Sequence, residues 1–190
     1  MFGEAPLIVT GVLNANLARF RSQSNSGRWG GLKFTGTNRF REPSTLTDCD
    51  IVDAILPIEV DGQSPQITGV NITITDPTNT VIMDGPGISI TGESAPVLND
   101  VEIDNYAGGL VIDTQGTRDR NTPTLTNIRV RNSNESSRAV PENSTGVTIN
   151  GVAQITDLEV DNFATGIVID NQDRSRTTTP TLTNIRIPIS

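Results

Sequence analysis

The chain has no histidine, a single lysine (Lys33) and a single cysteine (Cys49) among its 190 residues. One cysteine excludes an internal disulfide bond. The absence of histidine excludes every site in which an imidazole activates a serine or cysteine nucleophile. Cys49 takes the place of an aliphatic residue in a repeated phrase described below, so we predict that it is a small, buried hydrophobe.

Charge and hydropathy exclude two further classes of partner. The formal net charge is −8, and no block of lysine and arginine occurs. An acidic chain of this kind binds nucleic acids and anionic membranes poorly, so we predict no nucleic-acid partner. No run of about 18 apolar residues is present, so we also predict no membrane insertion. Aromatic residues make up only 4%, which suits a stacked repeat whose core forms between neighbouring coils.

What the chain does contain is repetition. A phrase of six residues occurs six times, with starts 21 to 31 residues apart. The copies are Leu46–Ile51, Ile67–Ile72, Leu98–Ile103, Leu125–Val130, Ile155–Val160 and Leu182–Ile187. Positions 1, 4 and 6 are apolar, position 3 is Asp, Asn or Gly, and position 5 is polar. A recurring period of this length indicates a stacked repeat architecture.

A second phrase alternates with the first, and in it a Gly or Pro precedes two apolar residues two positions apart. Its copies are Gly31–Phe34, Pro57–Val60, Gly87–Ile90, Gly109–Ile112, Gly146–Ile149 and Gly166–Ile169. Both phrases therefore show the period of a β-strand and not that of a helix. We predict an all-β fold, a parallel β-helix (a solenoid) of about six to seven coils with roughly 27–30 residues per coil.

We assign residues 1–190 to a single β-helix domain, with a less regular N-terminal coil over 1–28 and regular coils over 29–190. Each coil should contribute at least two strands, and strands of the same phrase should pair in parallel about 4.8 Å apart. The phrases do not locate a third strand in the coil.

Stacking turns position 5 of the first phrase into a column of alternating charge. This column contains Glu102, Arg129, Glu159 and Arg186, and a second column two residues further on contains Asp104, Arg131 and Asp161. Opposite charges on neighbouring strands stabilise a pair by roughly 0.2–1 kcal/mol, whereas like charges repel. A slip by one coil would oppose equal charges, so we interpret the two columns as a charge ladder that fixes the register.

The alternation coincides with a longer duplication. Asp100–Ala107 matches Asp157–Ala164, and Thr122–Arg129 matches Thr179–Arg186, both at an offset of 57 residues. The duplicated unit is therefore a pair of coils, one with an acidic strand and one with a basic strand.

Two sets of polar residues are candidates for ligand binding. The long loops at 114–123 and 171–180 carry four arginines that could hold an acidic glycan, or that could be solvated loop tips: Arg118, Arg120, Arg174 and Arg176. A column at the end of the second phrase would offer oxygen ligands to Ca²⁺: Asp61, Thr91, Asp113, Asn150 and Asp170. We interpret this column as turn residues that bond the local backbone, and we predict no cofactor.

Around Trp29 the chain shows a family resemblance. The segment Gly27–Phe34 reads Gly-Arg-Trp-Gly-Gly-Leu-Lys-Phe, and Ser64–Ile72 is a typical repeat that follows it. These segments resemble bacterial surface proteins with right-handed parallel β-helix repeats, within the pectate-lyase-like superfamily. The resemblance extends over nearly the whole chain and implies the fold and its right hand. Relatives of this fold include polysaccharide lyases, phage tailspikes and adhesins, so fold alone does not give the function.

The residues that such enzymes use are poorly represented here. Lyases of this fold usually need a Lys or Arg base, but Lys33 lies one coil from the N-terminal end and the strand arginines belong to the charge ladder. Polygalacturonase-type hydrolases use a Gly-His-Gly phrase, which a chain without histidine cannot contain. Asp104 and Asp161 could form a carboxylate pair about 10 Å apart, but Arg131 lies between them and would keep both ionised.

We therefore predict a non-catalytic structural or adhesive module, extracellular or on the cell surface. The alternative is a carbohydrate-binding or polysaccharide-cleaving, lyase-like β-helix. The expected partners are other copies of the chain, the remainder of a longer surface protein, or glycans. In end-to-end self-assembly, Arg186 of one copy would meet Asp50 of the next and continue the charge alternation.

Overall fold

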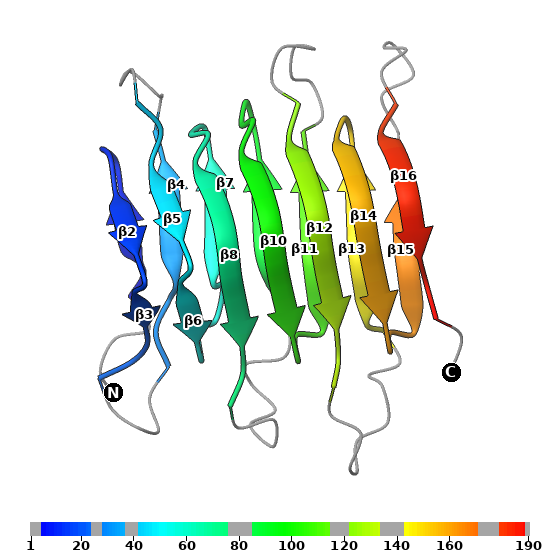
Figure 1. Ribbon diagram of the computed structural model, residues 1–190, viewed down its shortest axis with the longest axis horizontal. Helices are drawn as coiled ribbons and strands as arrows, with labels where there is room; N and C mark the ends of the chain where they lie inside the picture. Colours follow the sequence, from blue (N-terminus) through cyan, green and yellow to red (C-terminus); the bar gives the residue numbers. More distant parts are fainter. Residues whose placement is uncertain are drawn as a thin grey trace.

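The regular structure of this chain consists of parallel β-strands. A computed structural model describes residues 5–23, 28–36, 42–75, 85–114, 122–133, 143–170 and 179–188. Within these ranges the chain forms sixteen strands in two parallel sheets and no helix. The strands lie side by side along the long axis, with the N-terminus near one end and the C-terminus near the other (Figure 1). The prediction of an all-β fold with parallel strands is confirmed.

The second phrase forms the seven-stranded sheet, which we call sheet A. Its strands, in spatial order, are β1 (Leu7–Val9), β4 (Leu32–Thr35), β7 (Ile58–Asp61), β9 (Pro86–Thr91), β11 (Gly108–Asp113), β13 (Thr145–Asn150) and β15 (Thr165–Ile169). The first phrase forms the nine-stranded sheet B. Its strands are β2 (Asn14–Asn16), β3 (Arg19–Phe20), β5 (Thr45–Thr47), β6 (Asp50–Val52), β8 (Gln66–Thr73), β10 (Val97–Asp104), β12 (Thr124–Arg131), β14 (Gln154–Asp161) and β16 (Thr181–Arg186).

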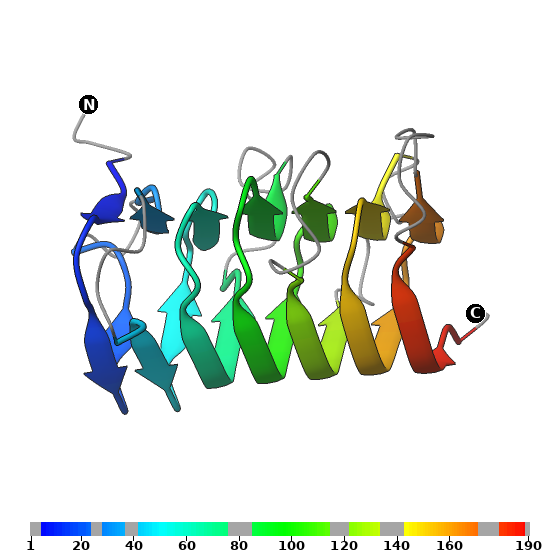
Figure 2. The ribbon, with the colours of Figure 1, turned by 90° about the horizontal axis from the view of Figure 1, so that it is seen from above.

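The chain passes from sheet A to sheet B and back, so that each strand pairs with the equivalent strand of the next pass. We call one sheet A strand together with the sheet B strand or strands that follow it a repeat. By this definition repeat 1 contains β1, β2 and β3, and repeat 7 contains β15 and β16. Viewed from above, the repeats follow one another along the long axis (Figure 2). The N-terminal segment is therefore a complete repeat, with β1 paired to β4 and β2 to β5.

Position 3 of the first phrase has a left-handed backbone in every repeat. The residues are Leu17, Asp48, Gly69, Asp100, Asn127, Asp157 and Asn184, with φ between 50° and 66°. The strand registers pass over this residue, pairing for example Asn99 with Thr126 and Val101 with Ile128. Asp, Asn and Gly tolerate this conformation better than other residues, which explains their presence at position 3.

The left-handed residue divides the sheet B strand into two segments. In repeats 1 and 2 the segments are separate strands, β2 and β3, then β5 and β6, whereas β8, β10, β12, β14 and β16 run through. Strict alternation along a strand would place positions 1 and 4 on opposite faces. Because position 3 does not pair with the neighbouring strand, position 4 faces inward again. Leu98, Val101 and Ile103 are therefore all buried.

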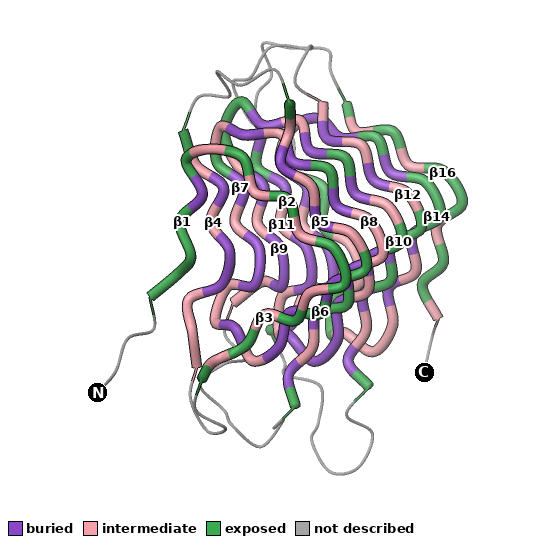
Figure 3. Tube along the Cα trace, turned by 60° about the vertical axis from the view of Figure 1, so that its left-hand side comes forward, coloured by how far each residue is buried: buried purple, intermediate pink, exposed green. Residues whose placement is uncertain are grey.

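The core lies between the two sheets and repeats with the phrases. The buried positions form continuous rows from one repeat to the next (Figure 3). Cys49 belongs to this core and is fully buried, as predicted. Trp29 borders the core near the N-terminal end, where its indole N–H donates to the carbonyl of Val52 at 2.9 Å and its ring stacks on Phe20.

The glycines that open the second phrase are required by packing. A Cβ at Gly109 would collide with the Val130 side chain of sheet B and with the carbonyl oxygen of Gly146. Gly87 and Gly146 meet the residue at position 6 of sheet B in the same way, through Ile103 and Val160. The side chain at position 6 of sheet B thus fills the space that a side chain on these glycines would need.

Gly109→Ala should therefore destabilise the protein by about 1–3 kcal/mol, because the added methyl overpacks the space between the sheets. The measurement is the free energy of unfolding in urea. Gly11→Ala is the matched control: a Cβ there meets nothing within 4 Å, so its change should stay within about 0.5 kcal/mol. Equal stability of the two variants would show that Gly109 does not set the distance between the sheets.

Tyr106, the only tyrosine in the chain, follows β10 and is fully buried. Its hydroxyl donates to the carbonyl of Ala54 at 2.9 Å, and burial raises the pKa of the phenol far above its ordinary value. Because the folded pKa lies above the unfolded value, this group stabilises the fold below about pH 10, and the contribution declines as the pH rises further. As the pH rises, the ultraviolet absorbance of tyrosinate should therefore increase only when the protein unfolds. Circular dichroism in the same titration measures the unfolding. Ionisation in a still-folded chain would contradict the assignment.

Candidate functional site

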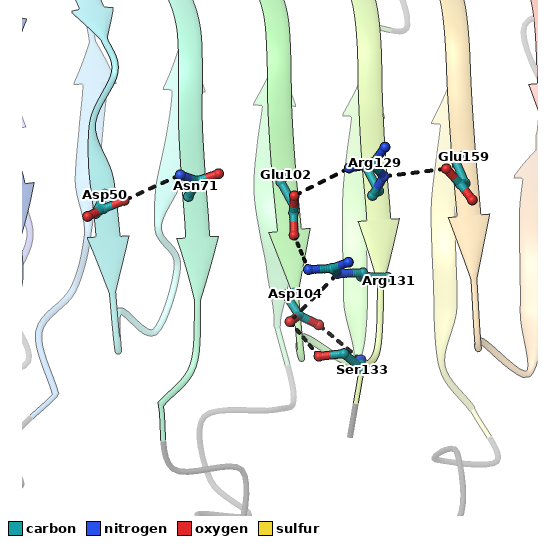
Figure 4. Close-up of polar contacts among 8 residues, drawn as sticks. All are labelled: Asp50, Asn71, Glu102, Asp104, Arg129, Arg131, Ser133 and Glu159. Carbon is teal, nitrogen blue, oxygen red and sulfur yellow. Dashed lines mark hydrogen bonds and ion pairs between the residues drawn. The ribbon is translucent and has the colours of Figure 1, made fainter. Parts of the chain in front are cut away.

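The outward residues of sheet B form aligned rows across the repeats. The row at position 5 contains Arg19, Asp50, Asn71, Glu102, Arg129, Glu159 and Arg186, each in register with the next. Two positions further on, a second row begins with the buried Val52 and continues with Thr73, Asp104, Arg131 and Asp161. Every residue that we placed in the charge ladder lies in one of these rows. Figure 4 shows part of both rows.

Arg129 lies between two glutamates on neighbouring strands. Its Nη1 is 3.6 Å from Glu102 Oε2, and its Nε is 3.4 Å from Glu159 Oε2. Glu159 also contacts Arg186, with 3.9 Å between Oε1 and Nη1. These four side chains form a chain of ion pairs across β10, β12, β14 and β16, partly visible in Figure 4.

The two rows are also joined to each other. Glu102 Oε1 contacts Arg131 Nη2, so Glu102 bridges Arg129 and Arg131. Arg131 Nε lies 3.8 Å from Asp104 Oδ2. Strand spacing predicts contacts along each row but not this diagonal contact, which depends on side-chain conformation. A network of several charges with fixed geometry holds register better than isolated surface pairs.

An uncharged strand separates two acidic strands. Repeat 2 presents Asp48 and Asp50, and repeat 4 presents Asp100, Glu102 and Asp104. Between them, β8 presents residues without charge at the same three positions: Gly69, Asn71 and Thr73. The Asn71 amide donates to Asp50 at 3.4 Å. This neutral strand keeps the carboxylates of repeats 2 and 4 apart where the charge does not change sign.

Position 3 carries a third row in which Asp and Asn alternate. The amide of Asn127 donates to Asp100, and the amide of Asn184 donates to Asp157. Asn99 adds a further hydrogen bond to Asp100 at 2.8 Å. The left-handed residues are thus bonded in pairs, between repeats 4 and 5 and between repeats 6 and 7. These bonds were not predicted from the sequence, although the strict order Asp, Asn, Asp, Asn at position 3 from residue 100 was a visible signal.

Asp104 has a structural role at the end of β10. Its two carboxylate oxygens accept hydrogen bonds from the Ser133 backbone N–H at 3.0 Å and from the Ser133 hydroxyl at 2.5 Å. Asp53 accepts the same two bonds from Thr75 at 2.8 and 2.7 Å. Arg131 lies in register between Asp104 and Asp161, so the carboxylate pair considered above is separated by a cation.

Lys33 is paired on sheet A. Its Nζ lies 2.8 Å from Glu59 Oε1 in the adjacent strand, and this hydrogen bond raises the pKa of Lys33 above its ordinary value. A lysine that acts as a base requires the opposite shift, because it must lose its proton near neutral pH. The pKa shift of Lys33 is therefore opposite to the one that a lysine base in a lyase would need.

The remaining candidates fall into two groups. Asp61, Thr91, Asp113 and Asn150 lie in one row at the end of sheet A, with Asp170 just after β15. Across the described ranges, no three acidic, cysteine or histidine side chains are grouped in a way that could hold a metal ion. The loop arginines Arg118, Arg120, Arg174 and Arg176 lie outside the described residues.

The charge ladder also borders a shallow depression of about 300 Å³ on the outer face of sheet B. Its lining comes from β12, β14 and β16 and includes Asn127, Arg129, Asp157, Glu159, Asn184 and Arg186. The depression therefore offers amide, guanidinium and carboxylate groups, and the side chains at its floor belong to the rows that hold the strands in register.

Repeat 1 extends the ladder at its N-terminal end and corrects one expectation. Ala15–Phe20 is a seventh copy of the first phrase, and its Arg19 pairs in register with Asp50. Asp50 therefore does not lie on a terminal strand. If copies stacked end to end in the ladder register, Arg186 would meet Arg19, so the contact predicted between Arg186 and Asp50 is wrong.

Comparisons with protein families, with curated proteins and with solved structures gave no match to this chain. Within the described part of the chain, no helix has the length and apolarity that a membrane span requires.

Arg129→Glu should destabilise the protein by about 1–2 kcal/mol at low salt, because two attractive neighbours become two repulsive ones. Arg129→Gln, which removes the attraction without adding repulsion, should cost less than about 1 kcal/mol. Urea unfolding at low and high salt gives the free energy of unfolding of each variant. The difference between the two variants should be smaller at high salt, because salt screens the charges. Equal stability of the two variants at low salt would mean that the ladder contributes nothing to register.

Proposed function

We propose that the chain is a right-handed parallel β-helix and that it works as a non-catalytic structural or adhesive module outside the cell. The right hand is supported by a general rule, since crossovers between parallel strands of one sheet are right-handed in about 98% of cases. The resemblance of Gly27–Phe34 to bacterial surface β-helix proteins supports both the hand and the setting.

The observation that carries this proposal is the mutual pairing of the charged side chains on sheet B. Glu102 binds both Arg129 and Arg131, and both oxygens of Asp104 accept hydrogen bonds from Ser133. Each of these side chains holds a neighbouring strand through its contacts, and a network of such contacts suits a mechanical role.

Such a module would act through stiffness and presentation. Backbone hydrogen bonds continue from repeat to repeat in both sheets, and repeats that contact only their neighbours form an extended scaffold. The outer rows then present a regular pattern of charge along the scaffold.

The depression beside the ladder favours one alternative, a carbohydrate-binding or carbohydrate-cleaving β-helix. Amide and charged side chains such as Asn127, Glu159 and Asn184 line it, and groups of this kind bond sugar hydroxyls. Retention of a polysaccharide without cleavage would favour the binding form of this alternative.

The test is incubation of the purified protein with pectin, alginate and a heparin-like polymer, with and without Ca²⁺. We expect no unsaturated products by ultraviolet absorbance and no new reducing ends, and light scattering with negative-stain microscopy should show elongated particles. Asp104→Asn and Asp161→Asn are the control variants that separate intrinsic activity from contamination. Cleavage that either substitution abolishes would overturn the proposal and establish an enzyme.

A further inference from the structure

We propose that Asn150 is a site of spontaneous deamidation, at which the folded chain converts a neutral residue of sheet A into a negatively charged one. Asn150 is the last residue of β13, Gly151 follows the strand, and both residues are partly exposed. The sequence contains no other asparagine that precedes a glycine. This covalent change belongs to the chain itself and goes beyond the proposed structural role.

The reaction needs only these two residues and water. The backbone nitrogen of Gly151 attacks the side-chain carbonyl carbon, Cγ, of Asn150, and the new N–Cγ bond closes a five-membered succinimide ring. The Cγ–Nδ2 bond breaks, and the amide nitrogen leaves as ammonia with the proton of the Gly151 N–H. Water then opens the ring at one of its two carbonyls. Opening at Cγ gives aspartate, whereas opening at the backbone carbonyl gives isoaspartate, in which the main chain runs through Cβ and Cγ.

Gly151 favours the attack because it has no side chain beside the attacking nitrogen. Asn127 and Asn184 are each followed by isoleucine, whose β-branched side chain crowds that nitrogen. Gly151 also has a φ of 115°, a conformation that residues with a side chain rarely adopt. The fold therefore requires glycine at this position, and it places Asn150 before the residue that hinders ring closure least.

Deamidation would bring carboxylates together in the row at the end of sheet A. In this row a neutral residue separates each acid from the next, and the members in order are Asp61, Thr91, Asp113, Asn150 and Asp170. A negative charge at residue 150 would give three carboxylates in succession, on strands about 5 Å apart. Like charges on directly neighbouring strands are destabilising.

The main chain on both sides of Gly151 is held by Thr114, which is buried in the preceding repeat. The Thr114 N–H donates to the Asn150 carbonyl at 2.9 Å. The Thr114 hydroxyl accepts from the Val152 N–H at 2.9 Å and donates to the Val152 carbonyl at 3.0 Å. These bonds fix the span of main chain between residues 150 and 152. Isoaspartate adds a methylene group to the main chain inside this span, so the product should lose part of this contact.

The experiment incubates the purified, folded chain at mildly alkaline pH and follows each asparagine by peptide mapping with mass spectrometry. Asn127 and Asn184 are matched controls in the same sample. We expect Asn150 to deamidate about tenfold faster than either of them, because glycine follows it and isoleucine follows them. Both aspartate and isoaspartate should form, and the incubated protein should unfold at a lower urea concentration than fresh protein. Asn150→Ser, which removes the reacting amide, should keep its urea midpoint through the same incubation.

A second variant separates the effect of charge from that of main-chain length. Asn150→Asp carries the charge of the product without the added methylene group. Its urea midpoint should fall at low salt and recover at high salt, because salt screens the repulsion from Asp113 and Asp170. The isoaspartate product should remain less stable at high salt, because the main chain between residues 150 and 152 is still too long.

Three outcomes would overturn the proposal. Equal rates at Asn150, Asn127 and Asn184 would show that Gly151 does not promote the reaction. Deamidation of Asn150 only in urea-unfolded protein would show that the fold prevents ring closure. Incubated protein that contains isoaspartate and is as stable as fresh protein would show that the change does not disturb sheet A. These outcomes do not bear on polysaccharide cleavage, the result that would overturn the proposed function.

Discussion

The left-handed residue at position 3 is the constraint on which the rest of this structure depends. A regular strand alternates its faces, so an eight-residue strand with inward residues at positions 1, 4 and 6 cannot be regular throughout. Asp100 and its equivalents adopt a left-handed conformation and do not pair with the neighbouring strand. This one-residue interruption turns position 4 back to the inner face. A left-handed residue recurs at position 3 in every repeat. The inner residues of both halves of each sheet B strand therefore face one core, and the outer residues align from strand to strand.

Alignment of equivalent residues on adjacent strands would place equal charges side by side, and the outer rows of sheet B avoid this repulsion. Equivalent side chains stand about 5 Å apart on adjacent strands, so a repeated acidic residue would meet its own copies. The chain changes sign from β10 to β16, inserts the neutral strand β8 between two acidic strands, and pairs Asp with Asn at position 3. These features occur at positions 3 and 5 of the first phrase and at the residue after position 6, so they do not restrict the buried positions, which remain mainly Leu, Ile and Val.

Much of this architecture could be predicted from the sequence, because short local patterns specify it and recur in each repeat. The two-residue spacing of the apolar positions indicates strands, and the recurrence of each phrase indicates which strands pair. Repeat 1 was harder to recognise, since Ala15 and Ala18 replace larger aliphatics and Leu17 stands where Asp, Asn or Gly is usual. The contact between Glu102 and Arg131 was beyond prediction, because rotamer choice decides it. The closeness of the sheets at Gly109 likewise emerges only from tertiary packing.

The neutral strand β8 has a consequence for how such a chain can grow or shrink. In the region from β10 to β16, loss of one repeat would bring Glu102 beside Glu159, whereas loss of two would keep every sign in order. Repeats there must be gained or lost in pairs, which matches the internal duplication at an offset of 57 residues. Next to β8 the parity rule does not apply, because Asn71 accepts a neighbour of either charge. The molecule thus contains a stretch whose length changes in even steps and one junction at which a single repeat could be exchanged.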